Sequence, residues 1–358
     1  MKKTITLCVA LCATVAVYAQ RQLATLNHND SISVYYGENA LSTALGASVN
    51  GDIITLSPGI FNGAIITKAV TIRGAGAESS NPTVIRTITG SLIQVPMYDT
   101  IYGINNSYRP VGSFIIYIPD DSVNYLRLEG LRIENKIQIV LLDNPLFLKC
   151  HFSSNFGYLV TGISSGPGGT NWHGFMRNAK FINCRIMYWP SDLGTYLHYT
   201  GTIFQNSIIM SSMSTSMSQT LINCVASTYS NSYWNGLSAI NSIILFGIGS
   251  NYPNYAYNCI GINPAGASWV DEYSGQCTEH NVHNFSNTTS IFSNQYTYTL
   301  LDSIATNYLG DDSTQIGIYG GQYPFNLDVT NPHIIRCNVA RRATADGRLP
   351  VDIEIVNE

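Results

Sequence analysis

Charged side chains are scarce in this chain of 358 residues: aspartate, glutamate, lysine and arginine together make up 11%, against about 25% in an average globular domain. A disordered chain needs high charge and few aromatic residues, so the composition excludes extensive disorder. The 18 lysines and arginines do not exceed the 22 acidic residues, and no basic cluster is present to neutralise phosphates. The sequence therefore argues against a nucleic-acid partner.

Long apolar runs are lacking beyond the N-terminus. Lys2 and Lys3 precede an apolar stretch at residues 4–17, and Val17 and Ala19 suit the −3 and −1 positions of a cleavage site before Gln20. This pattern predicts a signal peptide over residues 1–19 and an exported protein that is secreted, periplasmic or at the cell surface. No later segment reaches the roughly eighteen apolar residues of a transmembrane helix, so we expect no membrane span.

The rest of the chain repeats a short unit. Five segments share the frame of Phe181-Ile-Asn-Cys-Arg-Ile186, and their spacings are 23, 17, 18 and 17 residues. Such a unit holds two or three short strands with tight turns, because a helix, a strand and two loops need more residues. Asparagine tolerates the left-handed conformation of a sharp bend. We therefore predict about ten stacked coils between residues 50 and 320. Their aligned asparagines are Asn183, Asn206, Asn223, Asn241 and Asn258.

Two upstream segments extend this alignment. Phe147-Leu-Lys-Cys-His-Phe152 fits the frame with Lys149 at the asparagine position, and Leu126-Arg-Leu-Glu-Gly-Leu-Arg-Ile133 fits it loosely. The asparagine column is followed by a column of small residues. These are Cys184, Ser207, Cys224, Ser242 and Cys259.

The cysteines of this column lie two coils, or about 9.6 Å, apart, beyond the reach of a disulfide. We interpret them as small buried residues despite the exported context. Cys150 leaves two possibilities open, one long coil or two short coils before Cys184. Cys277 and Cys337 have no evident partner.

Both ends of the solenoid show signs of caps. Residues 39–49 predict a helix with one apolar face, and Gly51 follows as a stop. Residues 332–339 and 349–356 alternate like strands around a turn at residues 345–348. We expect this tail either to cap the C-terminal end or to serve as an attachment surface. The predicted boundaries are 1–19 for the signal peptide, 20–325 for the β-helix and 326–358 for the tail.

The residues after the first helix carry a family resemblance. Residues 51–63 read Gly-Asp, a strand, Pro-Gly and an aromatic residue, and residues 65–76 form a second strand ending in Gly-x-Gly. This order resembles the opening coils of the pectin-lyase-like superfamily of secreted bacterial proteins, and residues 316–325 resemble its terminal coil. Over residues 37 to 325 the resemblance implies an all-β, right-handed parallel β-helix solenoid with an N-terminal capping helix and a C-terminal β-strand tail.

Members of that superfamily commonly cleave acidic polysaccharides, but the residues for this chemistry are not evident. Glycosidases need two carboxyl groups about 5–10 Å apart, and residues 150–260 contain a single carboxylate, Asp192. The Asn-Thr-Asp, Gly-His-Gly and Arg-Ile-Lys motifs of the pectin-hydrolysing branch are absent. The acidic Ca²⁺ ligands of the lyases are not visible either, so Ca²⁺ is expected only if the chain is a lyase.

Candidate catalytic residues come from a Gly-rich stretch at residues 162–180 and its surroundings. His173 is a candidate base and Arg177 a candidate partner for a uronate carboxylate, with His151 and Asp192 as further candidates. The alternative is a surface loop whose histidine and arginine are merely solvated. A polysaccharide or cell-surface glycan would also stack on aromatic side chains. The candidates for this role are Trp172, Tyr188, Trp189, Tyr199 and Trp234.

One further cluster holds groups that can bind metals, although no established ligand spacing is matched. It contains Asp271, Glu279, His280 and His283, and its alternative is an exposed, solvated loop. Three hypotheses stay open. The protein binds or scaffolds on a glycan, it cleaves a polysaccharide as a lyase or glycosidase, or it is an adhesive or structural surface protein.

Overall fold

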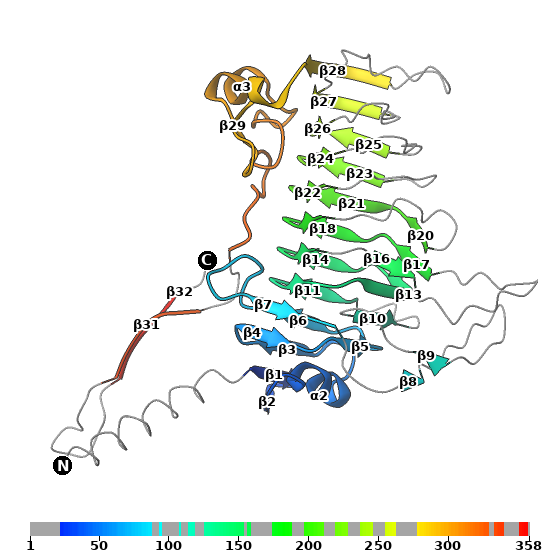
Figure 1. The fold of residues 1–358 in the computed structure, drawn as a ribbon, viewed down its shortest axis with the longest axis vertical. Helices are drawn as coiled ribbons and strands as arrows, with labels where there is room; N and C mark the ends of the chain where they lie inside the picture. The colour runs from blue at the N-terminus through cyan, green and yellow to red at the C-terminus, as the bar shows by residue number, and fades with distance from the viewer. Residues whose placement is uncertain are drawn as a thin grey trace, which may run out of the picture.

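Parallel strands stacked in coils form most of the molecule (Figure 1). The computed structural model describes residues 22–87, 93–94, 107–108, 114–118, 125–153, 156–158, 174–187, 197–210, 219–227, 237–245, 255–262, 278–328, 333–339 and 351–356. Each coil gives one strand to a first ladder and one to a second ladder, and a separate sheet lies on a third side. The fold is the predicted all-β parallel β-helix.

The strands follow the chain in regular order. The first ladder contains β3 (Ile53–Leu56), β6 (Thr71–Arg73), β11 (Arg127–Glu129), β14 (Leu146–Leu148), β18 (Lys180–Ile182), β21 (Thr202–Gln205), β23 (Gln219–Ile222), β25 (Leu237–Ile240), β27 (Tyr255–Ile262) and β28 (Thr278–Phe285). The second ladder contains β4 (Gly59–Phe61), β7 (Thr83–Ile85), β12 (Arg132–Ile133), β15 (His151–Phe152), β19 (Arg185–Ile186), β22 (Ile208–Ile209), β24 (Val225–Ser227), β26 (Ile243–Leu245) and the second halves of β27 and β28. The third side contains β5 (Ala64–Ile66), β10 (Phe114–Tyr117), β13 (Ile137–Asp143), β17 (Gly174–Arg177) and β20 (Leu197–Thr200), with β16 (Phe156–Tyr158) beside β13.

The number of coils agrees with the sequence, but their extent does not. The first ladder pairs in parallel from β3 to β28, which makes ten coils. The last coil ends at Phe285, not near residue 320. Strand β14 pairs directly with β18, so a single long coil separates Cys150 from Cys184. The open question about Cys150 is thereby settled.

A column of left-handed residues forms the corner between the two ladders. The five aligned asparagines have φ between 45° and 52°. Lys149 occupies the same corner with φ 52°, as the alignment predicts, and Gly130 and Asn281 extend the column with φ 62° and 55°. Asparagine and glycine enter this region at low cost, so the sequence bends the chain at the same place in each coil.

Stacked side chains fill the interior of the coils. Phe147, Phe181 and Phe204 occupy one inward column, with ring centroids 4.5 Å apart in the first pair and 4.9 Å in the second. The cysteines of the next column are buried and free, as predicted. Ser207 lies between Cys184 and Cys224 in this column, and its hydroxyl accepts a hydrogen bond from the backbone amide of Cys184 at 3.0 Å.

We expect the four buried thiols to be inert in the folded protein. Burial raises the pKa of Cys150 and Cys224 to about 12 and that of Cys184 well above its usual range, so no reactive thiolate forms near pH 7. A disulfide-exchange reagent should label none of the four in the native protein and all four in denaturant. Mass spectrometry of the labelled peptides measures this. Native labelling at Cys184 or Cys224 would contradict the burial.

The N-terminal end is capped by the predicted helix and by a hairpin that the sequence analysis missed. Helix α2 (Ala40–Ala47) buries Leu41, Ala44 and Leu45 against the core. Strand β1 (Leu23–His28) pairs antiparallel with β3 and with β2 (Ser31–Tyr36). The turn residues Asn29 and Asp30 both have positive φ, as a two-residue hairpin loop requires. These elements cover the open edge of the first coil.

The segment after the last coil, which we call the strap (residues 286–328), lies along the outside of the second ladder (Figure 1). It contains η2 (Thr288–Ser290), β29 (Phe292–Asn294), β30 (Thr299–Leu300) and α3 (Asp302–Asn307). Ile291, Ile316 and Ile318 of the strap form one core cluster with outward-facing Ile208 and Ile243 of the coils. The resemblance of residues 316–325 to a terminal coil is therefore wrong, because they form no strand and pack across earlier coils.

The asparagine corner anchors the strap. The Asn206 side-chain amide donates to the carbonyls of Ile318 at 2.9 Å and Gly320 at 2.6 Å. At Gly321, which has φ 73°, an added Cβ would lie 1.9 Å from the Asn223 amide nitrogen. Glycine therefore permits the close approach of the strap to the coils. The same asparagines bend the coils and hold the segment that covers them.

The predicted C-terminal strand pair is present as a separate hairpin. Strands β31 (His333–Val339) and β32 (Val351–Val356) pair antiparallel and join no strand of the coils. Figure 1 shows this hairpin away from β28, so it does not lie over the C-terminal end of the solenoid. A second small pair, β8 (Ile93–Gln94) and β9 (Ser107–Tyr108), also stands apart. In the described ranges no helix has the length and apolar character needed to cross a membrane.

Candidate functional site

Three adjacent coils place cationic or imidazole side chains in one outward column, which we call the cationic column (Arg132, His151 and Arg185). These residues pair in register on β12, β15 and β19. Their neighbours Ile133, Phe152 and Ile186 point into the core, so alternation along each strand turns the column outward. Adjacent strands lie about 4.8 Å apart, which sets the spacing of the three side chains.

A carboxylate from an earlier coil reaches this column. Glu78 lies in the loop at residues 74–82 between β6 and β7. Its Oε1 atom is 3.0 Å from His151 Nδ1 and 2.9 Å from Arg185 Nε. Neither nitrogen atom has a hydrogen-bond partner, so we describe both contacts as ion pairs. Among the residues described, no acidic side chain pairs with Arg132 within 4 Å.

The column favours the charged form of Glu78. The His151 contact, together with the charges of Arg185, His151 and Arg132, holds the pKa of this carboxyl below its usual 4.5, although partial burial opposes the shift. Glu78 is therefore ionised at neutral pH and unsuited to act as a general acid. The Arg132 Nε and His151 Nε2 atoms are buried without a hydrogen-bond partner, which leaves two donor or acceptor positions unsatisfied.

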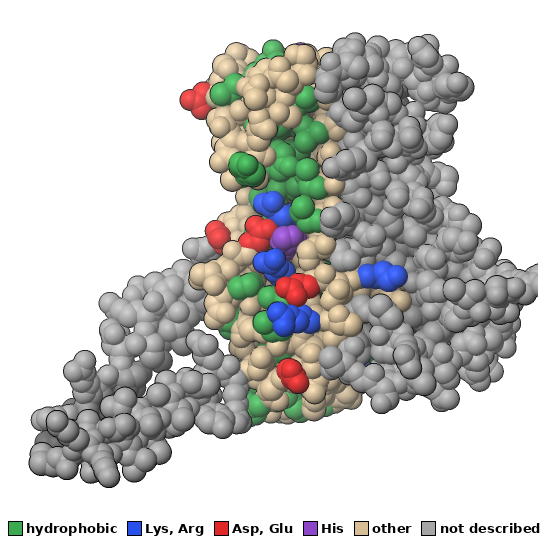
Figure 2. Space-filling view, viewed as in Figure 1, with side chains coloured by type: hydrophobic (Ala, Val, Ile, Leu, Met, Phe, Trp, Pro, Cys, Tyr) green, Lys and Arg blue, Asp and Glu red, His purple; other side chains and the backbone are tan. Residues whose placement is uncertain are grey.

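Further charges surround the column. Glu129 is paired with Arg73 at 3.3 Å and Arg127 at 3.0 Å, and Arg86 is paired with Glu134 at 3.2 Å. With the cationic column and Glu78, the cluster has five arginines against three glutamates, in a chain of net charge −4. Figure 2 shows charged side chains gathered at mid-height of this face, below an apolar strip. The cluster is a local excess of positive charge.

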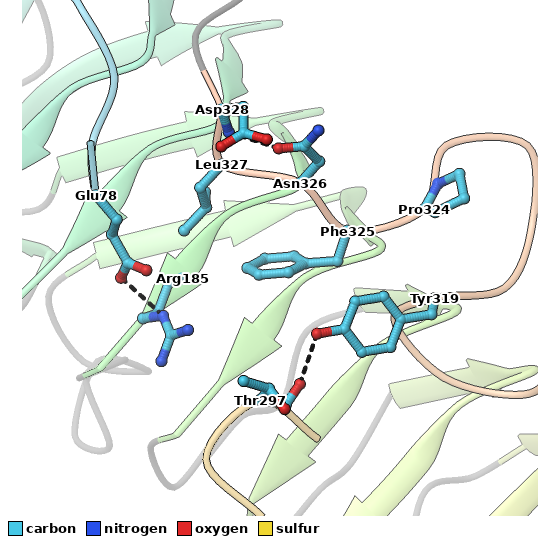
Figure 3. A pocket seen from close by; sticks show the side chains of 9 residues that line it. All are labelled: Glu78, Arg185, Thr297, Tyr319, Pro324, Phe325, Asn326, Leu327 and Asp328. Atoms are coloured by element: carbon cyan, nitrogen blue, oxygen red, sulfur yellow. Dashed lines mark hydrogen bonds and ion pairs between the residues drawn. The ribbon is translucent and has the colours of Figure 1, made fainter. Parts of the chain in front are cut away.

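A pocket of about 700 Å³ opens where the cationic column meets the strap. Glu78 and Arg185 line one side, and the strap forms the other, as Figure 3 shows. The strap residues that line the pocket are Thr297, Tyr319, Pro324, Phe325, Asn326, Leu327 and Asp328. Its size lies within the range of small-ligand sites, about 300–1,000 Å³.

The structure separates two of the catalytic candidates. His151 belongs to the cationic column, whereas Arg177 lies on β17 of the third side, where it pairs with Asp143 through two hydrogen bonds of 2.5 Å. These residues do not converge on one groove, and Gly174–Arg177 is a strand, not part of a loop excursion. His173 and Asp192 lie outside the described residues. Of the aromatic candidates, Tyr199 lies on β20, whereas Trp172, Tyr188, Trp189 and Trp234 also fall outside.

The metal candidates lie on a strand or beyond the described residues. Glu279, His280 and His283 belong to β28, and Asp271 lies outside. The His280 ring stacks on Tyr257 at 4.7 Å, and the His283 ring contacts Tyr308 at 4.5 Å. Burial lowers the pKa of His283. Within the described ranges, no three His, Cys, Asp or Glu side chains gather as ligands for a metal.

Of the residues of this site, only His151 was among the candidates predicted from the sequence. The repeat alignment already placed Arg132, His151 and Arg185 in the same position, one residue after the small column. Reading that position as an outward column would have identified the cluster. Glu78 and the strap residues carry no periodic signal, because they come from irregular segments far away in the chain.

Comparison of the chain with protein-family models, with curated proteins and with solved structures gave no match.

Proposed function

We propose that the protein is an exported carbohydrate-binding protein that takes an acidic glycan at the cationic column. The observation that supports this most is the charge of the cationic column. Glu78 pairs only with His151 and Arg185, no described acidic side chain pairs with Arg132, and the Arg132 Nε and His151 Nε2 atoms have no hydrogen-bond partner. Arginine binds carboxylates and sulfates well because its planar guanidinium group donates two parallel N–H hydrogen bonds to such oxyanions. The resemblance to the pectin-lyase-like superfamily and the predicted signal peptide support an extracellular glycan.

Binding of a polyuronate tests the proposal. Isothermal titration with polygalacturonate or alginate should show binding that weakens with salt, and neutral dextran should show none. Replacing Arg132 or Arg185 by glutamine should weaken binding about 10- to 150-fold each, since a charge-assisted hydrogen bond contributes about 1.5–3 kcal/mol.

Arg86→Gln is the matched control. Arg86 belongs to the same charged cluster but pairs with Glu134 outside the column, so its loss should leave affinity unchanged. Thermal melts of all three variants establish that they fold. Equal binding of dextran and polyuronate, or unchanged affinity in Arg185→Gln, would refute the proposal.

Cleavage of the same glycan is the second candidate, and the Glu78–His151 contact favours it. A carboxylate on Nδ1 orients an imidazole so that Nε2 faces a ligand as a base. New reducing ends should then appear with the wild type and vanish with His151→Ala. If the protein binds the glycan in the presence of Ca²⁺ but releases no new reducing ends, it binds the glycan without cleaving it.

A further inference from the structure

We infer that the pocket takes the end of an acidic glycan chain and not an internal stretch of it. This rests on the proposed function, and it concerns which part of the glycan enters. The walls of the pocket support this inference. They close the outward face of the second ladder on both sides of the cationic column.

The strap closes the side towards the C-terminal coils. Directly after Arg185, the column continues with Ile208, Val225 and Ile243, which are at most 1% exposed beneath strap residues. A glycan lying along the solenoid axis therefore meets the strap at the sixth coil. Phe325 and Tyr319 line the pocket at this wall.

The loop at residues 74–82 closes the opposite side. It starts in the second coil, yet Glu78 contacts side chains of the fourth and fifth coils, so the loop crosses the third. Val84, the column residue of the second coil, is 7% exposed. All three residues of the cationic column are partly exposed, with His151 and Arg185 at 12% and 23%, whereas Val84 beyond Arg132 is buried, so the accessible part of the column ends at Arg132.

The asparagine corner forms a third wall. Lys149, at the corner of the fourth coil, donates to the Asp328 carbonyl at 3.2 Å, which holds the end of the strap beside the pocket. In the fifth coil, the Asn183 amide lies 3.2 Å from the Tyr323 carbonyl. The strap therefore follows the asparagine corner from the sixth coil to the fourth, beside the pocket. A site with walls on three sides receives a chain end, whereas an internal run needs two open ends.

Chain length separates the two binding modes. Wild-type protein is titrated with purified oligogalacturonates of increasing length and with polygalacturonate of known chain number. The expected result is one protein bound per chain at every length, with an affinity per chain that stops rising once a few units fill the pocket. Arg185→Gln should weaken this binding by at least about tenfold at every chain length, which places the bound chain end in the pocket.

If the number of proteins bound per glycan chain rises with chain length, the site binds internal sugar units and the inference is overturned. The proposed binding of an acidic glycan would still stand. If neither oligomers nor polymer bind, the proposed function itself fails.

Discussion

Replacing Phe181 by alanine should lower the free energy of unfolding by about 3–5 kcal/mol. The side chain is fully buried at the centre of a stack, with ring centroids 4.5 Å from Phe147 and 4.9 Å from Phe204, and its edge faces Phe152 at 6.0 Å. The variant loses apolar burial and leaves a cavity that its in-register neighbours cannot collapse to fill. Urea unfolding followed by circular dichroism measures the loss.

The shape of the urea unfolding transition is the second part of this prediction. The strands of each coil pair only with those of the neighbouring coils, so a cavity in the fifth coil weakens the coupling of the coils on either side. The Phe181→Ala transition should broaden or split, whereas the wild type unfolds more cooperatively. Tyr296→Ala is the control, because this side chain is 90% exposed and its loss should change stability by no more than about 0.5 kcal/mol. A loss below about 1 kcal/mol at Phe181 would contradict the packing of the stack.

Replacing Asn206 by alanine should destabilise the protein by at least about 3 kcal/mol and release the strap. Two buried strap carbonyls lose their donor, each at a cost of about 1–3 kcal/mol when left unsatisfied. Alanine must also adopt the φ of 45° that asparagine tolerates, which costs about 1–2 kcal/mol. Limited proteolysis with mass spectrometry should detect cleavage within residues 309–328.

Asn206→Gly separates the two causes. Glycine keeps the left-handed corner and removes only the amide, so this variant should release the strap while losing less stability than alanine. If the strap resists protease equally in wild type, Asn206→Ala and Asn206→Gly, the corner does not anchor it.

The coils could be predicted because their determinants are local and repeated. Each corner needs a residue that accepts positive φ, and Asn183, Asn206 and Asn223 supply it at a regular spacing. The N-terminal hairpin also had a local signal that was overlooked, an Asn29-Asp30 turn between two alternating segments.

The strap and the site could not be predicted in the same way. Strap residues 309–328 have no period, and they dock on coils whose outward isoleucines look like any other strand residues. Glu78 meets Arg185 only because the coils fold the chain back on itself. The expected site around His173 and Arg177 rested on sequence proximity to His151, but Arg177 and His151 belong to different sheets.

The strap has a consequence for the order in which the chain folds. The coils can stack in sequence as they are synthesised, since the strands of each coil pair with those of the coil before it. The outward strip of Ile208, Val225, Ile243 and Ile260 stays uncovered until residues 286–328 follow. During that interval the nascent protein presents an apolar surface that favours association with other chains. The strap, which follows all ten coils in the sequence, is therefore the segment that covers this aggregation-prone surface.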